Sequence, residues 1–140
     1  MTEKLFVDTN VLVYAYDRDA GAKQRIAEMI LRDLWPQNAG AVSPQILQEF
    51  YVTVTRKIRF PLTKGSARRL VERYAAWSVN ISPAEILSAF KIEDEANIGF
   101  WDALIVASAA RARATKILTE DLNAGQIISG ILIENPFVGA

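Results

Sequence analysis

Four acidic residues stand where carboxylates are unusual, and these are Asp8, Glu49, Asp102 and Asp121. Asp8 directly follows the apolar run Leu5-Phe6-Val7, and Asp121 comes two residues after the run Lys116-Ile117-Leu118-Thr119, which has the composition of a strand. In parallel α/β sheets, ligands bind outside the carboxyl ends of the strands. Asp8 and Asp121 are therefore expected at the ligand-binding edge of such a sheet.

The other two acids fall in helical segments of apolar character. Glu49 lies three residues after Ile46, directly before Phe50 and four residues before Thr53, so we expect it to share their helix face. Burying a carboxylate without a partner is costly, which predicts a partner for Glu49. Asp102 lies in the first turn of the most apolar helical segment, directly after Phe100-Trp101. A helix buried on several sides does not need this acid for solubility.

Each acid also has an ordinary structural explanation. Asp8 fits an Asx-turn or a helix N-cap, and Glu49 fits a buried ion pair with an arginine. Asp102 fits an acid favoured by the helix dipole, worth about 0.3–1 kcal/mol. For the last acid, Glu120 is a rival beside Asp121, and either one fits a surface loop. A single site that gathers all four carboxylates explains them together.

The composition narrows the chemistry of such a site, because the chain contains neither histidine nor cysteine. This excludes a histidine general base, thiolate catalysis and cysteine-ligated zinc. Converging carboxylates repel one another unless a cation neutralises them, and hard cations prefer oxygen ligands. The expected ion is Mg²⁺ or Mn²⁺ rather than Zn²⁺. Four neighbouring polar residues would orient the acids or hold metal-bound water: Thr9, Asn10, Thr119 and Asn123.

The formal net charge is zero, yet the cations are unevenly distributed. The segment 56–73 carries seven cationic residues and one acid, a local charge of +6. A neutral domain with such a segment can still present one face to phosphates. The alternative is that these residues form the solvated faces of two helices.

The segments that must position the acids alternate between strands and helices. The expected strands are 5–7, 41–42, 79–81, 116–119 and 131–133, and the expected helices are 22–34, 44–59, 64–77, 84–90 and 100–112. Ser43, Thr63 and Ser82 are the expected caps of three of these helices. This alternation predicts an α/β fold with a central parallel sheet between layers of helices. No repeat or linker divides residues 1–140, which are expected to form one domain.

Membrane insertion and secretion are not expected. The longest apolar runs, such as Ala103 to Ala110, are too short to span a bilayer. The first residues lack the basic and apolar regions of a secretory signal. We therefore expect a cytoplasmic protein that has no membrane partner.

Four segments together resemble the motifs of the PIN-domain nucleases, and most of all the VapC-type toxins of type II toxin–antitoxin pairs. They are Phe6-Val7-Asp8-Thr9-Asn10-Val11-Leu12, Gln48-Glu49-Phe50, Phe100-Trp101-Asp102-Ala103-Leu104-Ile105 and Leu118-Thr119-Glu120-Asp121-Leu122-Asn123. The tail from Gly130 to Phe137 resembles the ending common in that group. Any one segment is weak evidence, whereas the four in order cover nearly the whole chain.

The resemblance implies a PIN-like three-layer fold and Mg²⁺- or Mn²⁺-dependent ribonuclease activity. It places the catalytic and metal-binding acids at Asp8, Glu49, Asp102 and Asp121, and so favours Asp121 over Glu120. One or two ions would sit among Asp8, Asp102 and Asp121, with Glu49 completing the cluster or accepting a proton from water. It further implies a homodimer and a small antitoxin protein. The residues expected to guide the RNA backbone are Arg56, Lys57, Arg59, Arg68 and Arg69.

Two other functions are compatible with parts of the sequence. A binding module could keep the fold without the chemistry, although it would have no reason to keep four acids in apolar settings. A phosphatase with an aspartyl nucleophile could use Asp8. Those enzymes resemble an Asp-x-Asp motif, whereas here Asn10 stands two residues after Asp8.

Overall fold

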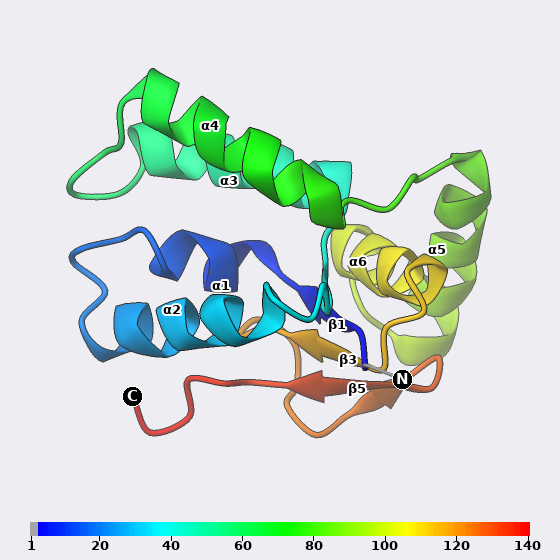
Figure 1. Cartoon of the computed structure of the whole chain (residues 1–140). Coiled ribbons are helices and arrows are strands. Elements are labelled where there is room, and N and C mark those ends of the chain that lie inside the picture. Colours follow the sequence, from blue (N-terminus) through cyan, green and yellow to red (C-terminus); the bar gives the residue numbers. More distant parts are fainter. Residues whose placement is uncertain (1–2) are drawn as a thin grey trace.

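In a computed structural model, which describes residues 3–140, short strands alternate with helices along the chain (Figure 1). The elements are β1 (Leu5–Val7), α1 (Thr9–Tyr14), α2 (Ala22–Leu34), β2 (Gly40–Ala41), α3 (Pro44–Arg56), α4 (Lys64–Tyr74), the 3-10 turn η1 (Ala75–Trp77), α5 (Pro83–Ala96), α6 (Phe100–Arg111), β3 (Lys116–Leu118), β4 (Ile127–Ile128) and β5 (Ile131–Glu134). The predicted α/β class is confirmed. Residues 1 and 2 of the predicted domain lie outside the described part.

The strands form one sheet in the order β2-β1-β3-β5-β4. β1 pairs in parallel with β2 and β3, and β3 pairs in parallel with β5. The predicted central parallel sheet is confirmed for these four strands, and β4, which the sequence did not predict, adds an antiparallel edge next to β5. Ser129 and Gly130 join these two strands with φ values of 51° and 77°, the positive φ values that a tight hairpin turn requires. β4 has only two residues, too few to show an alternating pattern in the sequence.

Several predicted elements differ from the structure, and the clearest differences concern residues 79–81, α3 and α5. Residues 79–81 form no strand, since the contact there is a single bridge between Val42 and Ser78. Helix α3 ends at Arg56 instead of near residue 59, and the chain then turns back so that the Leu62 N–H donates to the Val54 carbonyl at 2.8 Å. Helix α5 continues six residues past the predicted end and stops at Asn97, which adopts a left-handed conformation.

Two of the three predicted helix caps are made by side chains. The hydroxyl of Thr63 accepts from the Ser66 N–H at 3.1 Å. Ser82 and Glu85 form a reciprocal capping box at the start of α5. The hydroxyl of Ser43 makes no cap bond, and it is buried without a hydrogen-bond partner in the described residues. Helix α3 therefore begins with Pro44 alone as its N-terminal determinant.

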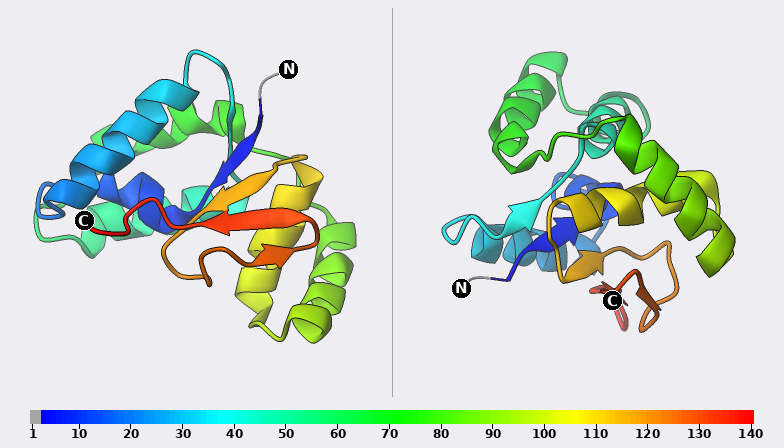
Figure 2. Two further views of the ribbon diagram at one scale, coloured as in Figure 1. Left: turned by 90° about the horizontal axis from the view of Figure 1, so that it is seen from below. Right: turned by 90° about the vertical axis from the view of Figure 1, so that its right-hand side faces the viewer.

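The helices flank the sheet in two groups, one formed by α5 and α6 and the other containing α1, α2 and α3. Figure 2 shows α5 and α6 packed together, and α6 also contacts β3 and β5, which explains its nearly continuous apolar sequence. The arrowheads of β1, β3 and β5 point toward the side where α1 and α2 lie (Figure 1). The carboxyl ends of the strands thus meet the start of α1. None of the helices within residues 3–140 has the length and apolar character that crossing a bilayer requires.

Candidate active site

Asp8 ends β1 and begins α1, and its side chain is 9% exposed. Its N–H donates to the Leu118 carbonyl at 3.0 Å, so the β1–β3 pairing extends to this residue. One carboxylate oxygen accepts from the Thr9 N–H at 2.7 Å, which makes Asp8 the N-cap of α1. The other accepts from the Thr119 hydroxyl at 2.7 Å. The N-cap explanation and the strand-end explanation of Asp8 both hold.

Burial raises the pKa of Asp8 from 3.8 to about 6. The hydrogen bonds from Thr119 and Thr9 lower this pKa, while the charges of Asp121 and Glu49 raise it further. A carboxylate held partly protonated by burial and like charges gains from a bound cation. The electrostatics of Asp8 therefore suit a cation site.

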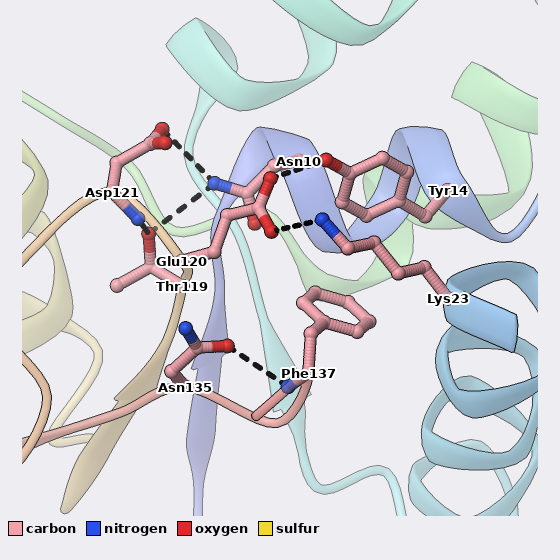
Figure 3. Close-up of polar contacts among 8 residues, drawn as sticks. All are labelled: Asn10, Tyr14, Lys23, Thr119, Glu120, Asp121, Asn135 and Phe137. Carbon is pink, nitrogen blue, oxygen red and sulfur yellow. Dashed lines mark hydrogen bonds and ion pairs between the residues drawn. The ribbon is translucent and has the colours of Figure 1, made fainter. Parts of the chain in front are cut away.

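The Thr119 hydroxyl connects three of the predicted site residues. It donates to Asp8, and it accepts from the Asp121 N–H at 3.0 Å and from the Asn10 side-chain amide at 3.3 Å. The same amide of Asn10 donates to the Asp121 carboxylate at 3.0 Å. Figure 3 shows Asn10 between Thr119 and Asp121. Thr119 and Asn10 thus orient two acids that are far apart in the sequence.

Asp102 and Asp121 lie at the ends of different elements and are coupled by charge. Asp102 is half-buried in the first turn of α6, and Asp121 is exposed in the loop after β3. Burial, and then the charge of Asp121, raise the pKa of Asp102. Asp121 also raises the pKa of Asp8. Asp121 is therefore electrostatically connected to acids on β1 and on α6.

Glu49 occupies a different environment from the one that its helix face predicts. It is exposed on α3, although Ile46 and Phe50 are fully buried, so the prediction of a buried glutamate is wrong. The helix packs through a narrower stripe than the sequence indicates, and Glu49 lies at its edge. It borders a shallow hollow of about 280 Å³ that also contains Lys57. Its charge still reaches Asp8.

The rival acid, Glu120, is held away from Asp121. Its carboxylate forms an ion pair with Lys23 at 3.0 Å and accepts a hydrogen bond from the Tyr14 hydroxyl. Figure 3 shows the side chains of Glu120 and Asp121 leaving the loop in different directions. The geometry therefore agrees with the choice of Asp121. Sequence analysis did not single out Tyr14 or Lys23.

Only one of these two residues had a recognisable pattern in the sequence. Tyr14 is four residues after Asn10 on the same short helix, so the two share a helix face. Lys23 begins a different helix, α2, and only the folded structure brings it to Glu120.

The residues present suit an oxygen-bound divalent ion. The site offers carboxylate, hydroxyl and amide oxygens, which are the ligands that Mg²⁺ and Mn²⁺ prefer. The Asn10 side-chain oxygen and the Thr9 hydroxyl are buried and have no hydrogen-bond partner among residues 3–140. Buried polar atoms without partners are unusual, so they are available to a water or ion. Within the same residues no three acids are close enough to form a ready-made metal cage.

The remaining predicted residues lie outside this network. Asn123 is exposed, and within residues 3–140 its side chain makes no hydrogen bond to the acids. The predicted RNA-guiding cations are all exposed on α3, on α4 or in the turn between them: Arg56, Lys57, Arg59, Arg68 and Arg69. Arg59 pairs with Asp19 at 3.7 Å. Lys57 is the member of the group that shares a hollow with a predicted catalytic acid.

Comparisons with known proteins identify the family and the fold. The family model described as "PIN domain" matches residues 5–127. A toxin-antitoxin complex from Klebsiella pneumoniae is similar in structure, with a TM-score of 0.70 and 23% identity over 96% of this chain and 98% of that one. VapBC2 from Rickettsia felis bound to a DNA fragment from their promoter gives a TM-score of 0.64 and 20% identity over 94% and 97%. No curated protein sequence matches significantly. At these identities the structural likeness concerns the fold.

Proposed function

Because this chain belongs to the PIN domain family, we propose that it is a Mg²⁺- or Mn²⁺-dependent endoribonuclease. The observation that carries the proposal is the charge coupling of Asp8 to Asp121 and Glu49, and of Asp102 to Asp121. Asp8 and Asp121 lie at the carboxyl ends of β1 and β3, where Thr119 and Asn10 link them, and Glu49 on α3 and Asp102 on α6 are each coupled by charge to one of these two acids. Such a site suits phosphodiester hydrolysis, since a cation held there would face the negative charge of the phosphate.

The proposed roles follow from the position of each side chain. Asp8, Asp102 and Asp121 hold the ion, and the bound ion would supply charge stabilisation at the phosphate and activate water. Thr119 orients the Asp8 carboxylate, and Asn10 orients the Asp121 carboxylate, each by donating a hydrogen bond to it. Glu49 is exposed at the edge of the site, where it completes the ligand set or accepts a proton from the attacking water.

The substrate is proposed to be RNA, and this choice over DNA rests on the family alone. The exposed cations of α3 and α4 contact the phosphate backbone in this proposal. Such contacts contribute affinity and position, and they carry no base sequence. Lys57 is the cation best placed to guide a strand toward the acids, because it borders the same hollow as Glu49.

The biological role proposed for the chain is that of a cytoplasmic toxin, a homodimer neutralised by a small antitoxin protein. Two structures of similar fold are toxin–antitoxin complexes, and one of them carries promoter DNA. This role would be supported by a small neighbouring reading frame, if that reading frame encodes a DNA-binding protein. Its absence would weaken the toxin role without affecting the nuclease proposal.

Replacing the acids one at a time tests the nuclease proposal. We expect Asp8→Asn, Glu49→Gln, Asp102→Asn and Asp121→Asn each to slow cleavage of single-stranded RNA in Mn²⁺. Loss of an outer-shell partner alone costs about 10–100-fold in metal sites, so loss of an ion-holding acid should cost at least about 100-fold. Mn²⁺ should also raise the melting temperature of the wild type, because ligands that bind only the folded state stabilise it.

Asp33→Asn is the matched control, since Asp33 is an exposed acid on α2. It should cleave at the wild-type rate. Cleavage that survives all four site substitutions would show that the acids are wrongly assigned. A wild-type protein that neither cleaves RNA nor is stabilised by Mn²⁺ or Mg²⁺ would contradict the proposed function.

A further inference from the structure

The three residues after β3 point alternately into and away from the site. The Thr119 hydroxyl and the Asp121 carboxylate both contact Asn10, whereas the Glu120 side chain turns toward α1 and α2 (Figure 3). Glu120 and Asp121 are joined by one peptide bond. Contacts that hold the Glu120 side chain therefore restrict the backbone from which the Asp121 side chain leaves. The contacts of Glu120 therefore bear on where Asp121 points.

Glu120 is held by a cluster that we define as Tyr14, Lys23 and Glu120, the Glu120 cluster. The ion pair with Lys23 at 3.0 Å is partly shielded, with side chains 34% and 22% exposed. The Tyr14 hydroxyl donates to the other carboxylate oxygen of Glu120. The Lys23 ammonium also lies 5.1 Å from the centre of the Tyr14 ring. Each member of the cluster therefore contacts the other two.

The C-terminal segment 135–137 packs against the Tyr14 ring of this cluster. The ring of Phe137 is buried and meets the Tyr14 ring edge-on, with 5.1 Å between the ring centres. The Phe137 N–H donates to the Asn135 side chain at 2.8 Å, which fixes the turn around Pro136 (Figure 3). Tyr14 is thus packed from one side by the tail and bonded on the other to Glu120.

Asp121 itself has few contacts that could fix its direction. It is exposed, and among residues 3–140 its side chain receives one hydrogen bond, from Asn10. Its N–H donates to Thr119, and the loop that follows, up to β4, contains no helix or strand. The Glu120 cluster fixes the residue directly before Asp121, and Leu122 directly after it packs against the core. The lysine of this cluster also neutralises a carboxylate that would otherwise add to the repulsion among the acids.

We propose, resting on the nuclease function proposed above, that Glu120 is a positioning residue: held by Tyr14 and Lys23, it fixes the loop after β3 so that Asp121 faces the ion held with Asp8 and Asp102. Glu120 does not touch the substrate or the ion in this proposal. The cluster acts only through the backbone between residues 119 and 121. Lys23 serves to hold Glu120 and does not bind phosphate.

The test measures Mn²⁺ binding by calorimetry, with the metal alone and the full chain. Glu120→Ala should weaken Mn²⁺ affinity by about 10–100-fold, the range found when outer-shell partners of metal ligands are removed. Glu120→Gln should stay within about threefold of the wild type, since its amide oxygen can accept from Lys23 while its NH2 group donates to the Tyr14 hydroxyl, which can also act as an acceptor. In an Asp121→Asn background, Glu120→Ala should add nothing, because the pair acts as one unit.

A second readout needs no metal. The Asp121 N–H donates to the Thr119 hydroxyl, so its hydrogen exchange, followed by NMR in EDTA, should be faster in Glu120→Ala than in the wild type. The matched controls are Lys91→Met and Glu95→Ala, which break an exposed ion pair on α5. Both controls should leave Mn²⁺ affinity and Asp121 exchange unchanged. Tyr14→Phe replaces Glu120→Ala if the latter does not fold, and it should weaken Mn²⁺ binding in the same direction.

The outcomes are distinguishable from failure of the proposed function. A wild type that binds no Mn²⁺ would overturn the proposed function and this inference with it. If Glu120→Ala binds Mn²⁺ as tightly as the wild type does, the positioning role alone is overturned. The same holds if Glu120→Ala weakens Mn²⁺ binding further in the Asp121→Asn background. A Lys23→Met variant with intact Mn²⁺ affinity and a raised KM for RNA would assign Lys23 to phosphate binding instead.

Discussion

At the scale of single residues, Asp8 shows how one side chain can serve the fold and the site at the same time. It receives the first helical N–H of α1 and the hydroxyl of Thr119 while it remains 9% exposed. These bonds stabilise its charged form, yet burial outweighs them and raises its pKa to about 6. The metal-free protein therefore carries a destabilising charge near neutral pH.

This imbalance predicts how stability changes with pH when no metal is present. The pKa of Asp8 is about 6 in the folded chain and 3.8 ordinarily, so between these values the folded state binds more protons than the unfolded state. Its stability should fall as pH rises through that window, by about 3 kcal/mol at 1.36 kcal/mol per unit. Asp8→Asn should remove this loss, and should be more stable than the wild type near pH 8 but not near pH 4.

Urea unfolding in EDTA across this pH range measures the effect. Asp33→Asn, which removes an exposed charge on α2, should follow the wild-type curve. An Asp8→Asn variant that is less stable than the wild type at high pH would show that the hydrogen bonds of the carboxylate outweigh its burial.

The sequence predicted which acids to consider better than it predicted their surroundings. Asp8 and Asp121 could be placed because a strand end is readable from the apolar run before it. The exposure of Glu49 could not, because it depends on how wide a stripe of α3 its neighbours cover. Lys23 could not be predicted either, since its contact with Glu120 joins residues 97 positions apart.

At the scale of elements, the short edge strand β2 depends on one close approach. Gly40 lies against the ring of Trp77, and a methyl group added at this glycine would sit 2.6 Å from the ring carbons. Trp77 is buried and packs against Trp35 and Tyr74 with ring centres 5.2 and 5.3 Å apart. The ring cannot yield without disturbing this aromatic group.

Gly40→Ala should therefore destabilise the protein by about 1–3 kcal/mol, the usual cost of overpacking a core. Gly65→Ala is the matched control with the opposite sign. Gly65 lies in helix α4 with space around it, and alanine is favoured over glycine there by about 1 kcal/mol. Thermal unfolding of both variants measures the difference. Equal stabilities for the two would contradict the close packing of β2 on Trp77.

The elements that could be predicted are those with a signal in their own residues, either an apolar periodicity or a side chain that caps the helix. Helices α2, α4 and α6 have enough turns for an apolar pattern to appear, and Thr63 and Ser82 mark two helix starts through their own side chains. β4 has two residues and exists only because β5 lies beside it. Residues 79–81 alternate like a strand, but only Ser78, just before them, meets Val42 in a bridge.

At the scale of the whole molecule, a net charge of zero conceals a division between acids and cations. Asp8 and Asp121 lie where β1 and β3 end, while the predicted RNA-guiding cations lie on α3, on α4 and in the turn between them. A strand of RNA that reaches the acids needs a cationic path, because phosphates and carboxylates repel each other. Arg56 and Lys57 end α3 on the same helix that carries Glu49.

This arrangement predicts a specific dependence of RNA affinity on salt. In the inactive Asp8→Asn background, Arg56→Ala and Lys57→Ala should each reduce the slope of log affinity against log salt by about 0.7, the value for one phosphate contact on a single strand. Fluorescence anisotropy with a labelled single-stranded RNA measures the slope. Lys91→Ala on α5 is the control and should leave it unchanged. Slopes that match this control would remove the two cations from the RNA path.

The pairing of β1 with β3 also has a consequence for the synthesis of the protein. Leu5 lies opposite Lys116, and the Asp8 N–H bonds to the carbonyl of Leu118. Asp8 leaves the ribosome 111 residues before its hydroxyl partner, Thr119, which is made only after α6. A chain whose translation stops before β3 has three of the four acids and no strand to hold them together. The order of synthesis thus leaves any chain that stops before β3 without the assembled site.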